Sequence, residues 1–224
     1  ERIEEIISTL RKRQEENRLN YYKPYRFQHN FHETGVDANQ RLLMAANRVG
    51  KSFVGAMEMA IHLTGLYPEW WVGKKYKEPI RACVCRASNE TTRDICQREL
   101  FGQPDNPRDK GKGSIPKHLI GETTRKPGVP NAHSSVLVKH SSGGWSRVAF
   151  KAYEMGAEKF MGESMDLVWL DEEPPQDIYS QCITRTLDRQ GQVYMTFTPE
   201  SGMTEVVQNF TTELRPKQAL ISAG

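Results

Sequence analysis

Two pairs of neighbouring side chains in this sequence are of the types that hold a metal ion and a triphosphate. Lys51 and Ser52 form the first pair, and Asp171 and Glu172 form the second. An ammonium group can reach the outer phosphates, while a hydroxyl and a carboxylate are hard oxygen ligands that suit Mg²⁺. A second carboxylate beside them can act as a base toward water. The chemistry indicated is magnesium-dependent ATP hydrolysis, provided that the fold brings the two pairs together.

The first pair ends a segment with the spacing of a phosphate-binding loop. Residues 45–52 match the pattern G-x-x-x-x-G-K-[ST], except that Ala45 stands at the first position. The apolar run 42–44 precedes the loop and a helical pattern, 53–63, follows it, as the motif requires. Gly50 allows backbone N–H groups to face a phosphate, and the helix N-terminus adds its positive end. A chance Gly-Lys-Ser before an ordinary helix is the alternative. We expect nucleotide contacts from Ala46, Asn47, Arg48, Val49, Gly50, Lys51, Ser52 and Phe53.

The second pair follows the apolar run 167–170, which is typical of a strand buried on both faces of a parallel sheet. The acidic residues then emerge at its carboxyl end, where open α/β sheets bind their ligands. If this strand lies beside the strand that feeds the loop, Asp171 faces the magnesium ion that Ser52 also approaches. Glu172 can then orient and deprotonate the water that attacks the γ-phosphate. The alternative is a solvated acidic turn that ends a strand.

Two further segments fit the same site. Thr196 and Thr198 alternate along the strand-like run 191–198, so both can face the γ-phosphate and report its loss, although plain strand residues need no function. Gln28 can pair with the N6 and N7 edge of adenine, while Tyr25, on the same side of a short helix after Pro24, covers the ring. An aromatic core with a solvated glutamine is the alternative for this segment.

The remaining patterns place these residues in a mixed fold. An amphipathic helix is predicted over residues 1–17 and is expected to lie across the domain surface. We also predict a buried strand over 79–86, a helix from the N-cap Ser88 to Leu100, an irregular surface excursion over 102–130, and a hairpin of strands 135–140 and 145–153. The fold class expected is α/β, a P-loop NTPase of the ASCE (RecA-like) type. Its central, mainly parallel sheet would be flanked by helices, with an antiparallel hairpin and an N-terminal helix added.

The composition is ordinary for one globular domain. The sequence has 224 residues and a net charge of +3, which is too small to indicate nucleic-acid binding by itself. No apolar run reaches the roughly 18 residues that a membrane-spanning helix needs, and no signal peptide opens the sequence. The four cysteines lack metal-ligand spacing with histidine, and Cys83 and Cys85 are expected to fill one face of a buried strand. This use of cysteine indicates a reducing, intracellular compartment.

Together these segments resemble the large terminase subunit of tailed double-stranded-DNA bacteriophages, most closely the members of headful-packaging phages. The segments that carry the resemblance, in the family's order, are 23–25 with Gln28, then 44–52, 62–68, 113–117, 168–175 and 196–199.

The resemblance implies an ATPase motor that uses Mg²⁺ and ATP to move double-stranded DNA into a procapsid, in the cytoplasm of the host cell. It assigns catalysis to Lys51, Arg48 and Glu172, metal binding to Ser52 and Asp171, and coupling to Thr196 and Thr198. The expected partners are double-stranded DNA, further copies of the chain in a ring, the portal of the procapsid and the small terminase subunit, with no membrane. Many members carry the loop arginine one position earlier, at Asn47 here, so the role of Arg48 within its own subunit is open.

The family also sets expectations for the domain boundaries. Residues 1–22 would be an N-terminal helix, 23–212 the ATPase domain, and 213–224 the start of a linker toward a nuclease domain absent here, so no nuclease activity is expected. A neighbouring subunit must donate a cation to the active site. The candidates for this cation are Arg125, Arg147 and Lys159, and the candidates for DNA contact are Lys74, Lys75, Lys77, Arg108, Lys110 and Lys112, unless these are simply solvated.

Two other functions fit parts of the pattern. A two-lobed nucleic-acid helicase or translocase shares the Asp-Glu strand and the later hydroxyl-rich motif, but it needs a second sheet domain beyond residue 224. An assembly module that binds ATP only as a structural ligand has no need of a base such as Glu172. Strand separation by the complete natural chain and phosphate release by a Glu172→Gln variant would separate these functions from a packaging ATPase.

Overall fold

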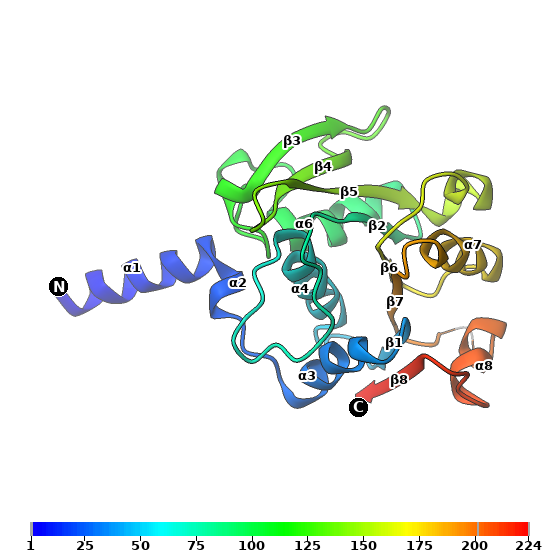
Figure 1. Ribbon diagram of the computed structural model, residues 1–224. Helices are drawn as coiled ribbons and strands as arrows, with labels where there is room; N and C mark the ends of the chain where they lie inside the picture. Colours follow the sequence, from blue (N-terminus) through cyan, green and yellow to red (C-terminus); the bar gives the residue numbers. More distant parts are fainter. Residues whose placement is uncertain (1, 201, 224) are drawn as a thin grey trace.

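A sheet of eight strands forms the centre of the protein (Figure 1). The computed structural model describes residues 2–200 and 202–223. The strand order is β3-β4-β5-β2-β6-β7-β1-β8, in which neighbours from β5 onward are parallel and the pairs β3/β4 and β4/β5 are antiparallel. The strands are β1 (Gln40–Ala45), β2 (Arg81–Arg86), β3 (Ile120–Arg125), β4 (His133–Lys139), β5 (Trp145–Ala152), β6 (Leu167–Asp171), β7 (Gln192–Phe197) and β8 (Gln218–Ala223). The predicted hairpin is therefore confirmed as β4 and β5.

Helices cover both faces of this sheet. The helices α2, α3, α4 and α6 pack on one face, and α7 and α8 pack on the other. Ser88 caps a helix that runs through α5, η2 and α6, as the sequence predicted. The helices are α1 (Arg2–Glu16), α2 (Arg18–Tyr21), α3 (Arg26–Glu33), α4 (Lys51–Thr64), α5 (Asn89–Thr91), the π-helix η2 (Thr92–Gln97), α6 (Arg98–Phe101), α7 (Gln176–Leu187) and α8 (Glu205–Thr211). Short 3₁₀ turns are η1 (Thr34–Val36), η3 (Pro107–Asp109), η4 (Lys117–Leu119), η5 (Tyr153–Met155) and η6 (Ala157–Phe160). No helix among these described residues is both long enough and apolar enough to span a bilayer.

Residues of the central strands alternate between two apolar cores. On β6, Leu167 and Trp169 belong to the core beneath α4, whereas Val168 and Leu170 belong to the core beneath α7 and α8. A strand buried on both faces needs a continuous apolar run, which explains the sequence of β6. On β2, the cysteines at positions 83 and 85 both enter the second core, as predicted.

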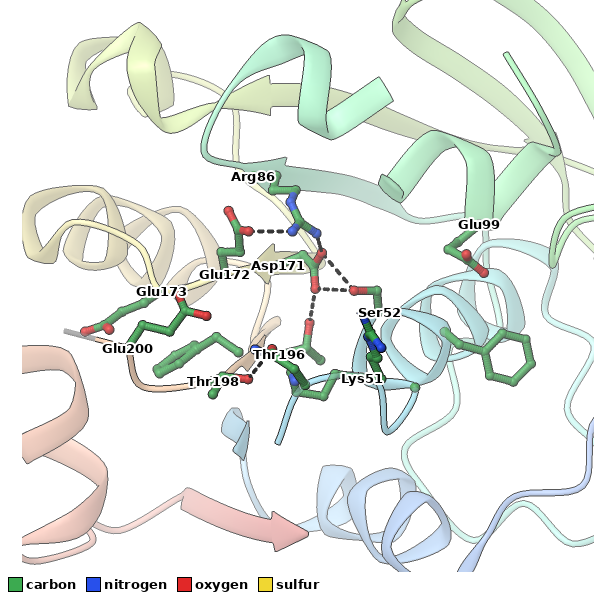
Figure 2. A pocket seen from close by; sticks show the side chains of 15 residues that line it. Lys51, Ser52, Arg86, Glu99, Asp171, Glu172, Glu173, Thr196, Thr198 and Glu200 are labelled. Carbon is green, nitrogen blue, oxygen red and sulfur yellow. Dashed lines mark hydrogen bonds and ion pairs between the residues drawn. The ribbon is translucent and has the colours of Figure 1, made fainter. Parts of the chain in front are cut away.

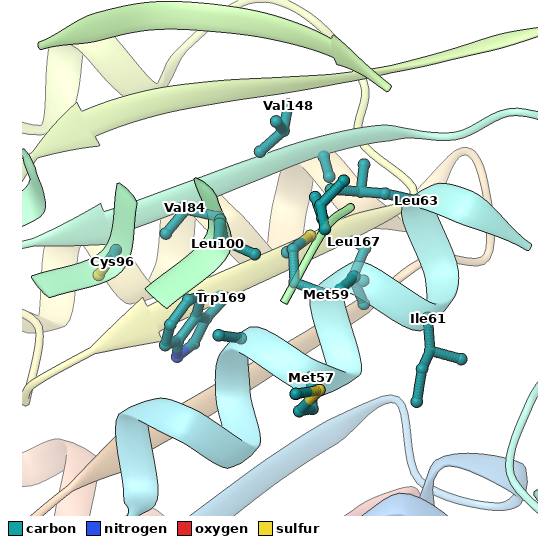
Figure 3. Close-up of a cluster of buried hydrophobic side chains, with 14 of the residues drawn as sticks. Met57, Met59, Ile61, Leu63, Val84, Cys96, Leu100, Val148, Leu167 and Trp169 are labelled. Carbon is teal, nitrogen blue, oxygen red and sulfur yellow. The ribbon is translucent and has the colours of Figure 1, made fainter. Parts of the chain in front are cut away.

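The indole of Trp169 lies against α4 at the position of a glycine (Figure 3). A β-carbon at Gly55 would lie 2.4 Å from the indole, so only glycine permits this close approach. The carbonyl of Gly55 also accepts a hydrogen bond of 2.7 Å from the hydroxyl of Tyr194 on β7. These contacts fix the helix, and therefore the loop that precedes it, relative to β6 and β7.

A buried ionic cluster holds the same helix to β1 and α3. The carboxylate of Glu58 on α4 lies 2.5 Å from Arg41, 2.5 Å from His32 and 3.1 Å from His62, and all four side chains are excluded from solvent. Burial alone would raise the pKa of Glu58, but Arg41 and hydrogen bonds from both histidines hold it well below its ordinary value. Burial lowers the pKa of His32 and of His62, so both rings are neutral and donate to an ionised carboxylate.

The first helix differs from expectation. Its apolar positions Ile3, Ile6, Ile7 and Leu10 are exposed by 73%, 52%, 44% and 48%. None of its described residues is buried, and α1 projects away from the body of the protein (Figure 1). The prediction that this helix lies across the domain surface is therefore wrong, because its apolar stripe meets no complementary surface in the described chain. Glu1, included in the predicted helix, lies outside the described residues.

Three details of the sheet also differ from the sequence analysis. The strand of Asp171, β6, does not lie beside β1, because β7 pairs with both and separates them. The excursion 102–130 contains the edge strand β3, whose polar residues hide the alternation typical of strands. Residues 218–223, within the expected linker, form β8 and pair in parallel with β1. The sheet therefore extends further at both edges than the sequence patterns indicated.

We predict that Glu58→Gln lowers the free energy of unfolding by about 3–5 kcal/mol, because Arg41 is then buried without its counter-ion. Urea denaturation of both proteins measures the difference. Glu69→Gln, at an exposed loop position, is the matched control and should change the same free energy by less than about 0.5 kcal/mol. If the two variants were equally stable, the cluster would have no anchoring role.

Candidate active site

The two predicted pairs of residues meet at the carboxyl edge of the parallel strands (Figure 2). The hydroxyl of Ser52 lies 3.0 Å from each carboxylate oxygen of Asp171. Both residues line a cavity of about 500 Å³ together with Lys51 and Glu172. The phosphate loop and the acidic strand, more than a hundred positions apart in sequence, thus form one site, as predicted.

The loop between β1 and α4 has the backbone shape of an anion cradle. Gly50 has a φ of 86° and Arg48 a φ of 67°, which is a rare conformation for a residue with a side chain. The helix α4 begins at Lys51, so its unpaired N–H groups and positive dipole end face the cavity. The Lys51 ammonium donates a hydrogen bond of 2.6 Å to the carbonyl of Ala46. Its partial burial lowers the pKa of Lys51, with nearby Asp171 opposing the shift.

Asp171 is buried and surrounded by hydrogen-bond donors. Thr196 donates to its carboxylate at 2.7 Å, Ser52 donates at 3.0 Å, and Arg86 forms an ion pair with it. Burial raises the pKa of Asp171, and the guanidinium of Arg86 and the two hydroxyls oppose this shift. Within the described residues, no group of three or more His, Cys, Asp or Glu side chains is arranged to hold a metal ion. A cation bound here would therefore share its coordination with phosphate and water, which is how Mg²⁺ is usually held beside a nucleotide.

Glu172 is held in a strained position at the end of β6. Its φ is 76°, and its backbone N–H donates to the carbonyl of Thr196 at 3.1 Å. The hydroxyl of the buried Tyr153 donates to the carbonyl of Glu172 at 2.9 Å, which holds the backbone of this turn in place. The carboxylate remains about half exposed and forms an ion pair with Arg86. The backbone conformation therefore aims the side chain into the cavity that Ser52 and Asp171 line.

Arg86 is a site residue that the sequence analysis missed. It ends β2, and its guanidinium contacts both acidic residues at the end of the neighbouring strand β6. The signal was present, because the predicted strand 79–86 ends in this arginine and parallel strands present their carboxyl ends at one edge. The side chains of Glu99, Glu173 and Glu200 also line the cavity and were likewise not predicted.

The two threonines predicted to couple hydrolysis to movement take different positions. Thr196 is buried between Trp169, whose indole N–H donates to it at 2.8 Å, and the carboxylate of Asp171. Thr198 lies beyond the end of β7, where its hydroxyl donates to the carbonyl of Ala45 at 2.7 Å. Both line the cavity. One threonine therefore touches the acidic strand and the other touches the start of the phosphate loop.

The residues predicted to bind adenine lie on the other side of the loop. Tyr25 and Gln28 line a second cavity of about 730 Å³. Gln28 is buried, and its amide oxygen accepts the backbone N–H of Tyr25 at 2.9 Å as part of the cap of α3. Its amide nitrogen would lie 3.9 Å from a β-carbon at Gly50, so the amide group is close to the loop. Tyr25 is 73% exposed, and its ring is free to cover a ligand.

The three residues expected to act on a neighbouring subunit do not line the cavity formed by Ser52 and Asp171. Arg125 ends the outer strand β3, and Lys159 lies in the 3₁₀ turn η6 that follows β5. Arg147 pairs in register with Arg81 at the amino end of β2, so it lies at the sheet edge opposite to the site. Among the candidates for DNA contact, Lys74 donates to the carbonyl of Gln190 at 2.7 Å, Lys112 pairs with Asp109 at 2.8 Å, and Lys75, Lys77, Arg108 and Lys110 lie in the same two loop regions.

Comparison with known proteins identifies the family of this chain. The family model described as terminase large subunit, T4likevirus-type, N-terminal, matches residues 42–223. The large terminase subunit of Salmonella phage P22 is 37% identical, and the match covers 90% of this chain and 44% of that protein. The chain thus spans less than half the length of this curated relative.

Two solved structures share the fold. The large terminase ATPase domain of Thermus phage P74-26 and a mutant of it align with TM-scores of 0.62 and 0.61, at 15% identity. Each alignment covers 92% of this chain and 83% of the other. At this identity the likeness is one of fold, and it confirms the predicted α/β class of P-loop type. Because the family model extends from the strand before the phosphate loop to the last strand of the sheet, this protein belongs to the terminase large-subunit family.

Proposed function

We propose that this chain hydrolyses ATP to drive double-stranded DNA into a viral procapsid. The observation that carries the proposal is the contact of 3.0 Å between Ser52 and Asp171, because it joins a phosphate loop to an acidic strand in one cavity. Membership of the terminase family supports genome packaging as the process that the hydrolysis drives.

The two cavities beside the loop suit the two ends of ATP. Arg48, Gly50 and Phe53 line both of them, so the phosphate loop forms the ridge between them. In this arrangement the triphosphate lies on the loop and extends toward Asp171, and the adenine lies beside Tyr25. Ala46, Asn47 and Val49 complete the loop backbone around the phosphates, and Gln28 offers its amide nitrogen to the base.

Each side chain at the phosphate end of the site has its own role in hydrolysis. Ser52 and Asp171 present hard oxygens to one point and so suit Mg²⁺, which when bound neutralises charge on the outer phosphates. Lys51 exchanges its bond to a loop carbonyl for a phosphate oxygen. Glu172 orients the attacking water and takes its proton, and Arg48 contacts the terminal phosphate within its own subunit.

Movement follows from the contacts around the acidic strand. Thr196 bonds to Asp171 and Thr198 bonds to the start of the loop, so both respond when the terminal phosphate leaves. The motor works as a ring of subunits on DNA, docked at the portal of the procapsid and assisted by the small terminase subunit. A neighbouring subunit completes each site with Arg125, Arg147 or Lys159.

For the chemical step, we predict that Glu172→Gln lowers ATP turnover by about 10²–10⁴-fold while ATP still binds, because the base is lost and the cradle is kept. Phosphate release and nucleotide titration measure the two quantities. Glu163→Gln, whose exposed carboxylate pairs with Arg81 away from the site, is the control and should retain wild-type turnover. Full turnover by the Glu172 variant would contradict the assigned role.

For nucleotide recognition, we predict that Tyr25→Ala weakens ATP binding by about tenfold, because the base loses its stacking partner. Calorimetric titration with ATP and with tripolyphosphate measures the change. Tripolyphosphate has no base, so its affinity should not change. Equal losses for both ligands would place the effect on the phosphate side and contradict adenine stacking at Tyr25.

For assembly, we predict that turnover per subunit rises with protein concentration, because a cation donated in trans contributes about 10³–10⁵-fold to such reactions. Phosphate release across a dilution series, with sedimentation velocity at the same concentrations, measures the dependence. A dilute monomer that hydrolyses ATP as fast as the assembled protein would contradict the ring.

A further inference from the structure

The guanidinium of Arg86 bridges the two carboxylates that the proposed function assigns to metal binding and catalysis (Figure 2). Its Nη1 contacts Oδ2 of Asp171 and its Nη2 contacts Oε1 of Glu172. The side chain is only 16% exposed, and its Nε is buried without a hydrogen-bond partner among the described residues. Arg86 is therefore paired with both carboxylates through its terminal nitrogens, and its Nε remains available for a further hydrogen bond.

The contacts of Arg86 are incompatible with a site that holds Mg-ATP. Oδ1 of Asp171 accepts hydrogen bonds from Thr196 and Ser52, and Oδ2 accepts from Ser52 and is also contacted by Arg86, so neither oxygen is free for a cation while Arg86 stays in place. A divalent ion beside this carboxylate would lie close to the guanidinium, and two cations at such short range repel each other strongly at low dielectric. Glu172 has a similar conflict, because its Oε1 contacts Arg86 and is therefore not available to a water molecule.

We propose that Arg86 is a counter-ion switch, which holds Asp171 and Glu172 in the nucleotide-free site and transfers to the terminal phosphate when Mg-ATP enters. The switch rests on the proposed function and adds a regulatory residue to it. In the empty site the arginine replaces the missing cation and keeps the base occupied. Once Mg-ATP has entered, the departure of Arg86 would leave Asp171 able to hold the metal ion and Glu172 able to contact the attacking water.

The surroundings of Arg86 allow this exchange. Its backbone is fixed, because residue 86 pairs with residue 152 of β5, and the helix after it is capped by Ser88. Only the side chain has to move, and it lines the same cavity as Lys51 and Ser52, where the phosphates lie in the proposed arrangement. A guanidinium can form paired bonds with phosphate, and the unused Nε of Arg86 can supply one of them.

The inference can be tested by metal binding in the absence of nucleotide. Arg86→Gln removes the internal cation, so we expect Mn²⁺ to bind the nucleotide-free protein at least about tenfold more tightly than wild type. Electron paramagnetic resonance of free Mn²⁺ measures this affinity. Arg86→Lys keeps one charge but loses the fork, and it should give an intermediate affinity. Arg81→Gln, at the other end of β2, is the matched control and should bind Mn²⁺ as wild type does.

A second readout concerns the terminal phosphate. Wild type should prefer ATP to ADP, and Arg86→Gln should reduce this preference by at least about tenfold, while ADP affinity changes little. Thermal unfolding confirms that each variant is folded. A folded Arg86→Gln protein with unchanged or weaker Mn²⁺ binding, or with an unchanged preference for ATP, overturns the switch. If wild type itself binds no Mg-ATP, the proposed function fails and not only the role of Arg86.

Discussion

The hydrogen bonds between Ser52 and Asp171 depend on the order of three strands. The strand β7 lies between β1, which leads into the phosphate loop, and β6, which ends in the acidic pair. Adjacent strands lie about 4.8 Å apart, so the intervening strand sets a separation of roughly twice that value between the two motifs. This gap is wide enough for phosphate groups and a hydrated cation. It also places Thr196 of β7 directly between the motifs, where its hydroxyl bonds to Asp171.

This spacing is useful only if α4 cannot shift along the sheet. Two unlike interactions prevent such a shift. On the side of β6, an indole packs against a glycine of the helix so closely that no larger residue fits. On the side of β1, the buried carboxylate of Glu58 binds Arg41 and two histidines. The apolar contact fixes the distance between helix and sheet, and the ionic cluster fixes the register, because hydrogen bonds depend on direction more strongly than apolar contacts do.

The sequence alone was sufficient for the parts of the site that follow a local rule. The loop 45–52 has a fixed spacing, and the acidic pair follows a clearly apolar buried strand, so local patterns were enough to predict both. The position of β7 could not be predicted in this way, since strand order depends on long-range pairing that no single segment encodes. The polar strand β3 and the late strand β8 escaped because edge strands need less apolar sequence. Arg86 was missed for a different reason: its role depends on a neighbouring strand, and an arginine that ends a strand is ordinary by itself. The position of α1 was predicted wrongly for another reason: an apolar stripe predicts that a helix makes a contact, but it does not identify the surface that the helix contacts.

Each cation and hydroxyl expected to meet the nucleotide already has a partner within the protein, except that Arg48 has none among the described contacts. Lys51 bonds to a loop carbonyl, Ser52 bonds to Asp171, and Thr198 bonds to the start of the loop. Arg86 pairs with both Asp171 and Glu172. Binding of ATP is therefore an exchange of hydrogen bonds, in which the gain is the difference between new and old partners. Because the old partners include Asp171, Glu172 and the loop backbone, the exchange necessarily changes the geometry of the acidic pair and of the loop. A site built in this way links occupancy to conformation through its own contacts, and a motor requires that link before any neighbouring subunit or DNA takes part.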